Sequence, residues 1–261
     1  MDSGCILFFD SGIGGLTLMK ECARKLRGKT FVYLGDNANA PYGNRTHEEI
    51  VQLTLSSFKR VLNYSVRAAI IACNTVTAEC ALALRAICPF PVIGVEPALK
   101  PAAKSCKNVL VLATRATLSS NKFRTLLQRV SNGCRFTCFC PHALAGEIEK
   151  NIADLSRIDL AVHLPEGEFD GAVLGCTHYI FLRNEISAAL NCPVFDGNSG
   201  TADHLAEVLA RQVEINTLPS AIDGKFFPSC GENILYDEYN NLIIFEGDSA
   251  LKNRRVYCSC F

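Results

Sequence analysis

Short apolar runs alternate with segments of helical periodicity along most of the chain. Segments 47–62 and 143–155, for example, repeat apolar residues with the period of a helix, which predicts amphipathic helices. Strands that alternate with helices form parallel sheets, because each helix carries the chain back to the edge where the next strand starts. The runs that predict strands are 6–9, 30–34, 68–72, 92–95, 109–113, 134–139, 171–174 and 193–195.

The two halves of the chain repeat this plan with nearly constant spacing. Chance agreement between short apolar runs would produce some matches. It does not explain why a cysteine, followed within two residues by a threonine, ends a strand in both halves. We therefore interpret the pattern as an internal duplication of one α/β unit. The corresponding landmarks are Asp10 with Thr114, Phe31 with Phe136, Cys73 with Cys176, and Pro91 with Pro193.

The duplication predicts an α/β fold of two pseudo-symmetric lobes, each a mostly parallel sheet flanked by helices. We expect the first lobe to comprise residues 1–97 plus 205–261 and the second lobe residues 98–204. In this division the tail to Phe261 returns to the first lobe. Open α/β sheets bind ligands at the carboxyl ends of their strands, so the active site is expected between the lobes.

The charge balance argues against several classes of partner. Lysine plus arginine number 26 and aspartate plus glutamate also number 26, which gives a net charge of zero. Such a chain has no general field to hold nucleic acid or an anionic membrane, although a small local patch stays open. No apolar run is long enough to span a bilayer, and no cleavable leader is visible. We expect a cytoplasmic protein with a small-molecule substrate.

The fourteen cysteines have no compact spacing. A large chain with an ordinary apolar content does not need a disulfide framework, so we interpret them as reduced thiols, most of them in the core. No tandem CxxC pair is present, and we expect no metal site.

Two loops follow the first two predicted strands. Asp10 to Gly15 is glycine-rich, which allows the backbone to approach a ligand closely and favours anion binding at the following helix. Its spacing is not that of a dinucleotide fingerprint. The second loop, 35–43, ends in Pro41-Tyr42-Gly43. Each loop on its own is equally well explained as an ordinary turn.

Cys73 and Cys176 end equivalent predicted strands, near the starts of predicted helices. Amide and hydroxyl side chains follow the first, and hydroxyl and imidazole side chains follow the second. A helix N-terminus and adjacent donors lower the pKa of a thiol from about 8.5, so we expect both thiols to ionise readily. One cysteine among fourteen would be interpreted as a core residue, but an equivalent pair in a duplicated fold indicates function.

Two thiols on opposite faces of one ligand suit racemisation at carbon. One group removes the α-proton and the other delivers a proton to the opposite face. Asp10 would orient one thiol or accept its proton, and His178 would do the same for the other. A structural histidine is the alternative for His178, but its position directly after Cys-Thr favours a catalytic role.

The motifs resemble, in order, those of the glutamate racemases over about residues 5–210. They are Phe8 to Gly15, Gly35-Asp36 with Pro41-Tyr42-Gly43, Cys73-Asn74-Thr75, Gly94-Val95-Glu96-Pro97, and Leu174-Gly175-Cys176-Thr177-His178-Tyr179. The resemblance implies a cofactor-independent isomerase in which Cys73 deprotonates D-glutamate and Cys176 deprotonates L-glutamate. It also implies a homodimer that supplies D-glutamate for peptidoglycan, and therefore for cell wall biogenesis and cell shape.

The same resemblance implies the substrate-binding residues. They are Asp10, Ser11, Tyr42, Gly43, Asn74, Thr75, Thr117, Thr177 and His178, and Thr114 is similar to a second family threonine after the fifth strand. The family's pocket glutamate corresponds to Glu149 rather than Glu147. The chain has Ile180-Phe181 where the family usually has Pro-Leu, and the tail beyond Leu218 matches no motif.

Three other functions remain open. An aspartate or other amino-acid racemase of the same superfamily would use the same two thiols. A hydrolase or decarboxylase would use one cysteine with a separate base. A non-catalytic ligand-binding protein of two lobes would need neither thiol. A pyridoxal enzyme is disfavoured, because no Schiff-base lysine with a phosphate site is recognisable.

Overall fold

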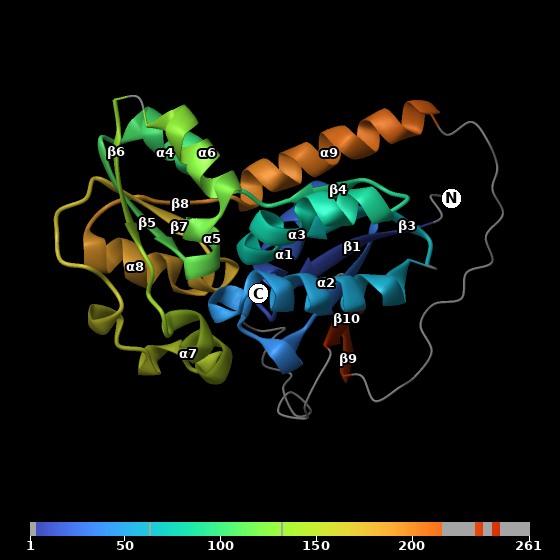
Figure 1. The fold of residues 1–261 in the computed structure, drawn as a ribbon, viewed down its shortest axis with the longest axis horizontal. Coiled ribbons are helices and arrows are strands. Elements are labelled where there is room, and N and C mark those ends of the chain that lie inside the picture. The colour runs from blue at the N-terminus through green and yellow to red at the C-terminus, as the bar shows by residue number, and fades with distance from the viewer. Residues whose placement is uncertain (1–3, 63, 132, 216–232, 237–241, 246–261) are drawn as a thin grey trace.

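The apolar runs form two sheets that lie side by side in the computed structural model (Figure 1). The structure describes residues 4–62, 64–131, 133–215, 233–236 and 242–245. The first sheet contains, in spatial order, β4 (Val92–Gly94), β3 (Val66–Ile71), β1 (Cys5–Asp10), β2 (Thr30–Gly35), β10 (Leu242–Phe245) and β9 (Asn233–Tyr236). The second contains β6 (Arg135–Phe139), β5 (Asn108–Ala113), β7 (Gly171–Gly175) and β8 (Val194–Asp196).

Both sheets have the same strand order. The first four strands are arranged β4-β3-β1-β2 and the next four β8-β7-β5-β6, and all the pairs within these two sets are parallel. The antiparallel pair among the described strands is β9 with β10. The predicted two-lobed α/β fold with an internal repeat is therefore confirmed.

Helix starts are encoded by local sequence. Thr46 caps α2 (His47–Val61): its hydroxyl accepts a hydrogen bond from the Glu49 amide, and the Glu49 carboxylate accepts one from the Thr46 amide. The other α-helices are α1 (Leu16–Lys25), α3 (Asn74–Ile87), α4 (Leu99–Ser105), α5 (Arg115–Ser119), α6 (Asn121–Val130), α7 (Leu144–Asn151), α8 (Arg183–Leu190) and α9 (Asn198–Ile215). Short 3₁₀ helices are η1 (Asn37–Asn39), η2 (Tyr42–Asn44), η3 (Leu155–Arg157), η4 (Leu160–Val162) and η5 (Thr177–Leu182).

Strand β1 is buried along its whole length, because its two faces enter two different apolar clusters. Phe9 packs with Phe58 of α2 on one face. Phe8 on the other face belongs to a cluster that also contains Leu110 and Leu174 of the second sheet. The lobes therefore share one continuous core, which fixes the strand ends of one relative to those of the other.

Helix α9 packs along α1. Lys25 Nζ lies 2.7 Å from Asp203 Oδ1, and Asn198 Nδ2 donates to Thr17 Oγ1 at 3.1 Å. Further along the chain, β10 runs parallel to β2. Neither β9 nor β10 was predicted from the sequence. The rest of the predicted tail, to Phe261, lies outside the described residues.

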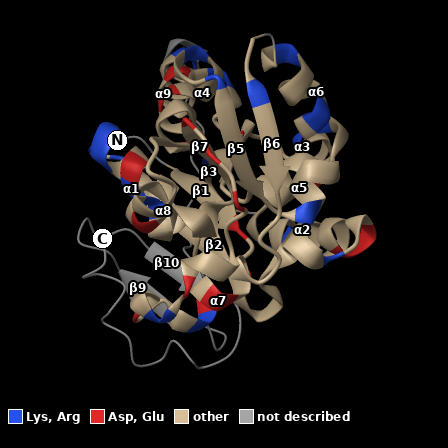
Figure 2. Cartoon of the chain, turned by 90° about the vertical axis from the view of Figure 1, so that its left-hand side faces the viewer, with Lys and Arg blue, Asp and Glu red and all other residues tan. Residues whose placement is uncertain are grey.

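Charge is unevenly distributed although the net charge is zero. No aspartate or glutamate occurs between Pro97 and Gly146, and blue segments lie on α4, β6 and α6 in Figure 2. None of the described helices combines the length and the hydropathy that a membrane span requires.

Candidate active site

Cys73 lies directly after β3 and is the N-terminal cap of α3. Its Sγ is 3.4 Å from Ser11 Oγ of the glycine-rich turn after β1. Burial, reinforced by the negative charge of Asp10, raises the pKa of the Cys73 thiol to about 12. The expectation of a readily ionised thiol is wrong for Cys73, because removing the thiolate from water outweighs the donors at the helix start.

Cys176 occupies the equivalent place after β7, at the start of η5. Its Sγ is 3.8 Å from His178 Nδ1, as the sequence pattern predicts. Burial disfavours the imidazolium, but the contacts with Cys176 and Glu149 prevail and raise the pKa of His178 well above its usual range. A positive charge therefore stands beside the second thiol. The two thiols are close enough that the charge of Cys176 contributes to the raised pKa of Cys73.

Glu149 of α7 completes the surroundings of His178. Its Oε1 lies 2.6 Å from His178 Nε2 and accepts the Ile13 amide at 2.9 Å, and its Oε2 accepts Asn37 Nδ2 at 3.2 Å. Glu147 instead lies 3.0 Å from His163 Nε2. The structure thus brings Glu149, rather than Glu147, to the thiols.

Asp10 connects the lobes. Its Oδ1 accepts the Gly12 amide at 2.9 Å, and its Oδ2 accepts Thr177 Oγ1 of the second lobe at 3.0 Å. Burial raises the pKa of this carboxyl, against the opposing charge of His178. The Cys73 thiol has its polar contact with Ser11, whereas Asp10 acts on that thiol through its charge.

The glycines of the first turn allow this close approach. A Cβ at Gly12 would lie 1.9 Å from Glu149 Oε1, and a Cβ at Gly14 would lie 2.3 Å from Thr177 Oγ1. A side chain at either position would require the turn or its neighbours in the second lobe to shift.

Threonine hydroxyls form a second connection between the lobes. Thr75 Oγ1 is 2.9 Å from Thr114 Oγ1, which donates to Thr117 Oγ1 at 3.0 Å. Gly43 lies against the Thr114 side chain, where a Cβ would come within 2.6 Å of Cγ2. Buried Asn74 Oδ1 accepts no hydrogen bond from any described residue. The predicted substrate-binding residues are thus gathered at the facing strand ends.

Asp36, Asn37 and Tyr33 support the site but were given no role from the sequence. Asp36 Oδ2 accepts the Tyr42 hydroxyl at 2.5 Å. The buried Tyr33 hydroxyl donates to the Gly12 carbonyl at 2.7 Å. Asp36 was recognisable as part of the loop motif after the second strand, whereas the contacts of Tyr33 and Asn37 depend on tertiary structure.

The family model described as Asp/Glu/Hydantoin racemase matches residues 10–205. The chain belongs to this racemase family. A curated relative, the glutamate racemase of Clostridium novyi, is 35% identical over 237 residues, which cover 87% of this chain and 91% of the relative. This confirms the resemblance to glutamate racemases.

Solved structures of the racemase family agree with the fold. Glutamate racemase isoform RacE1 of Bacillus anthracis has a TM-score of 0.71 at 28% identity, covering 81% of this chain and 84% of that one. The Escherichia coli glutamate racemase, in complex with L-glutamate and the activator UDP-MurNAc-ala, has a TM-score of 0.69 at 31% identity, covering 79% and 83%. Within the described part of this racemase-family chain, no group of three or more histidine, cysteine, aspartate or glutamate side chains is arranged so that it could hold a metal ion.

Proposed function

We propose that this chain is a glutamate racemase that interconverts L- and D-glutamate by proton transfer through two thiols. The observation that carries the proposal is the equivalent position of Cys73 and Cys176 after corresponding strands of two like sheets. Curated relatives named glutamate racemase support glutamate as the substrate.

In the direction from L- to D-glutamate, Cys176 acts as the base. The imidazolium of His178, 3.8 Å from its sulfur, stabilises the thiolate, and Glu149 maintains the charge of His178. The thiolate removes the α-proton, and the Cys73 thiol donates its own proton to the opposite face. The cycle ends with a Cys176 thiol and a Cys73 thiolate.

From D- to L-glutamate the roles reverse, so Cys73 must ionise. The raised pKa of Cys73 in the closed, buried site opposes this. The α-ammonium of a bound amino acid would place a positive charge close to this thiol and favour its thiolate. We therefore expect Cys73 to become a base once the substrate is bound.

The remaining site residues bind the substrate in this proposal. Asn74 Oδ1, buried and without a donor among the described residues, accepts a hydrogen bond from the ammonium. The hydroxyls of Thr75, Thr117 and Thr177 are donors for carboxylates. The other proposed contacts are Asp10, Ser11, Tyr42, Gly43, His178 and Glu149.

Several properties of the enzyme belong to the same proposal. It would act as a cytoplasmic homodimer, without an organic cofactor or metal, and supply D-glutamate for peptidoglycan. We also propose lobes of residues 1–97 plus 205–261 and of residues 98–204. The parallel pairing of β10 with β2 supports the return of the tail to the first lobe.

Circular dichroism of the purified protein with L-glutamate, and then with L-aspartate, tests the activity. The signal of L-glutamate should decay to zero, and dialysis against a chelator should leave the rate unchanged. Loss of one methylene in a fitted pocket typically costs about 1–3 kcal/mol, so kcat/KM for aspartate should be lower by about 10- to 200-fold. Equal or faster turnover of aspartate would make the enzyme an aspartate racemase.

A further inference from the structure

A pocket of about 430 Å³ opens where the two lobes meet at the surface. We call it the lip pocket. Gly43, Arg45, His47 and Glu79 line it from the first lobe, and the start of α5, including Arg115 and Ala116, lines it from the second. Its volume lies within the range of small-molecule sites. No step of the proposed mechanism uses its charged residues.

The lip pocket adjoins the candidate active site through one thin wall. Gly43 lines the pocket and also lies against the side chain of Thr114. Thr114 is hydrogen-bonded to Thr75, two residues after Cys73. The Gly43–Thr114 contact therefore lies between the pocket and the thiols, and a local shift of the Gly43 loop would join the two spaces.

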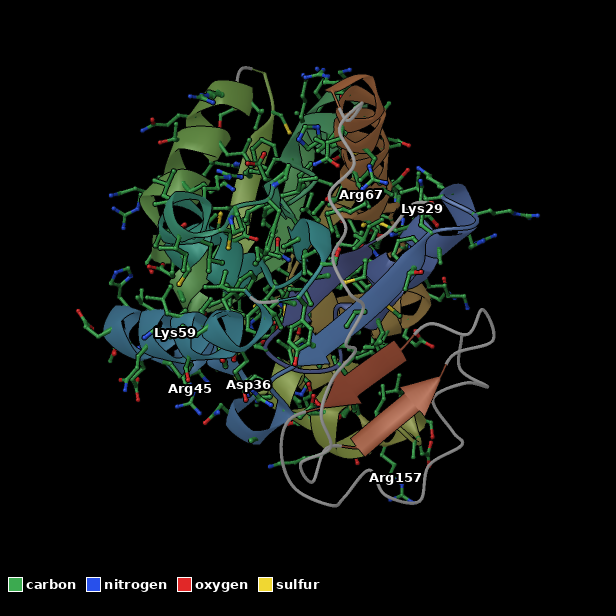
Figure 3. The ribbon with its side chains drawn as sticks, turned by 90° about the vertical axis from the view of Figure 1, so that its right-hand side faces the viewer. Lys29, Asp36, Arg45, Lys59, Arg67 and Arg157 are labelled. Carbon is green, nitrogen blue, oxygen red and sulfur yellow. The ribbon has the colours of Figure 1, made fainter. Side chains whose placement is uncertain are left out.

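The charges around the lip pocket are not equally engaged. His47 Nδ1 lies 2.6 Å from Glu79 Oε2. Arg45 donates from Nε and Nη2 to the Asn39 carbonyl at 3.0 and 2.8 Å, and its Nη1 is 3.8 Å from Glu49 Oε1. Figure 3 shows Arg45 beside Asp36, at the foot of α2. These hydrogen bonds tie the Arg45 guanidinium to the loop after β2.

Arg115 is different. It is the exposed first residue of α5, and its guanidinium makes no hydrogen bond or ion pair with any residue that the structure describes. An unengaged guanidinium at the rim of a pocket is a ready partner for a carboxylate. It stands immediately after Thr114, and so at the wall where the pocket meets the site.

We propose that the lip pocket is the entry site for the anionic amino acid and that Arg115 attracts its carboxylate. The inference rests on the proposed glutamate racemase activity. Glutamate carries two carboxylates and one ammonium, so its net charge is negative and it is attracted to a positive rim. Glu79, on the opposite wall, carries a negative charge that repels the substrate and limits how strongly the pocket retains it.

The test compares Arg115→Gln and Glu79→Gln, with Arg124→Gln as the matched control. Arg124 is an exposed arginine of α6, on the same lobe, which does not line the pocket. At low ionic strength, Arg115→Gln should lower kcat/KM by about three- to tenfold, as expected for one charge near the path of an ion, with kcat within about twofold. Because enantiomers have equal free energies, the loss must be the same in both directions.

Glu79→Gln should raise kcat/KM by about two- to threefold under the same conditions. In about 1 M salt, charges are screened over about 3 Å, so the kcat/KM values of all variants should become equal. Opposite effects of the two variants distinguish attraction from a structural role, which would lower activity in both. Equal kcat/KM for Arg115→Gln and Arg124→Gln at low salt would overturn the entry site. Absence of glutamate turnover by the unaltered protein would instead overturn the proposed function.

Discussion

Glu149 Oε1 lies 2.6 Å from His178 Nε2, and the same oxygen accepts the amide of Ile13 from the other lobe. One carboxylate oxygen therefore both maintains the charge of the imidazole and ties α7 to the glycine-rich turn. This shared contact makes the state of His178 sensitive to how closely the lobes approach.

Replacing Glu149 by glutamine should lower the pKa of His178, because the nearest negative charge is lost. The imidazolium would then deprotonate as the pH rises through a lower value, and Cys176 would lose its stabilising charge earlier. We expect racemisation to fall by about 100-fold near neutral pH, the scale of a general acid–base contribution, and its alkaline limb to move to lower pH. Glu147→Gln, which alters the partner of His163, is the control and should leave the pH profile of kcat/KM unchanged.

Each thiol should be essential for racemisation, whereas deprotonation of a given enantiomer should require only one of the two thiols. Cys73→Ser and Cys176→Ser should both abolish racemisation, since an alcohol is far less acidic than a thiol. Loss of a β-leaving group requires deprotonation only. Cys73→Ser should therefore still eliminate from the L-form of such an analogue, and Cys176→Ser from the D-form.

Isotope exchange gives a second measure of the same pair. In deuterium oxide, the newly formed enantiomer should carry deuterium at Cα while the remaining substrate stays protonated. The exposed Cys138 supplies the control, since Cys138→Ser should racemise normally. Two serine variants that processed the same enantiomer would contradict the assignment of the thiols.

Gly12→Ala should inactivate the protein and destabilise it. The added Cβ would lie 1.9 Å from Glu149 Oε1, so either the turn or the carboxylate must move. We expect loss of most activity and a lower free energy of unfolding, measured by urea denaturation. Gly200→Ala in α9 has no neighbour within 4 Å and replaces glycine by the best helix former, so it should stabilise by up to about 1 kcal/mol.

The protein should lose stability at alkaline pH. Burial raises the pKa of Cys5 and Cys80 to about 11, and of Cys22 and Cys73 to about 12. Between about pH 9 and 11 these thiols are ionised in the unfolded chain but protonated in the folded one. The unfolded state then binds fewer protons, so the free energy of unfolding falls as the pH rises, by up to about 1.4 kcal/mol per pH unit for each thiol. Cys22→Ala should reduce this slope, and an unchanged slope would contradict the prediction.

The sequence predicted strands β1 to β8 and the positions of Cys73 and Cys176, because a buried parallel strand ends where an apolar run gives way to polar residues. It identified the proximity of Cys176 and His178, which is a local relationship. It did not predict the high pKa of Cys73, since that depends on how completely the folded lobes exclude water. The contacts of Asn37 and Tyr33 were missed for the same reason: each joins residues that only the tertiary fold brings together.

The like strand orders of the two sheets give the thiols equivalent backbone positions, but their neighbours differ: a serine hydroxyl beside Cys73 and an imidazolium beside Cys176. Under the proposed mechanism, conversion of L-glutamate begins with the mobile proton on Cys73. Each conversion of L-glutamate leaves that proton on Cys176 instead, and the enzyme must then either process a D-molecule or return the proton through solvent. The protonation of the two thiols therefore records which enantiomer was last released. At high substrate concentration, the return of the proton from Cys176 to Cys73 through solvent would limit turnover.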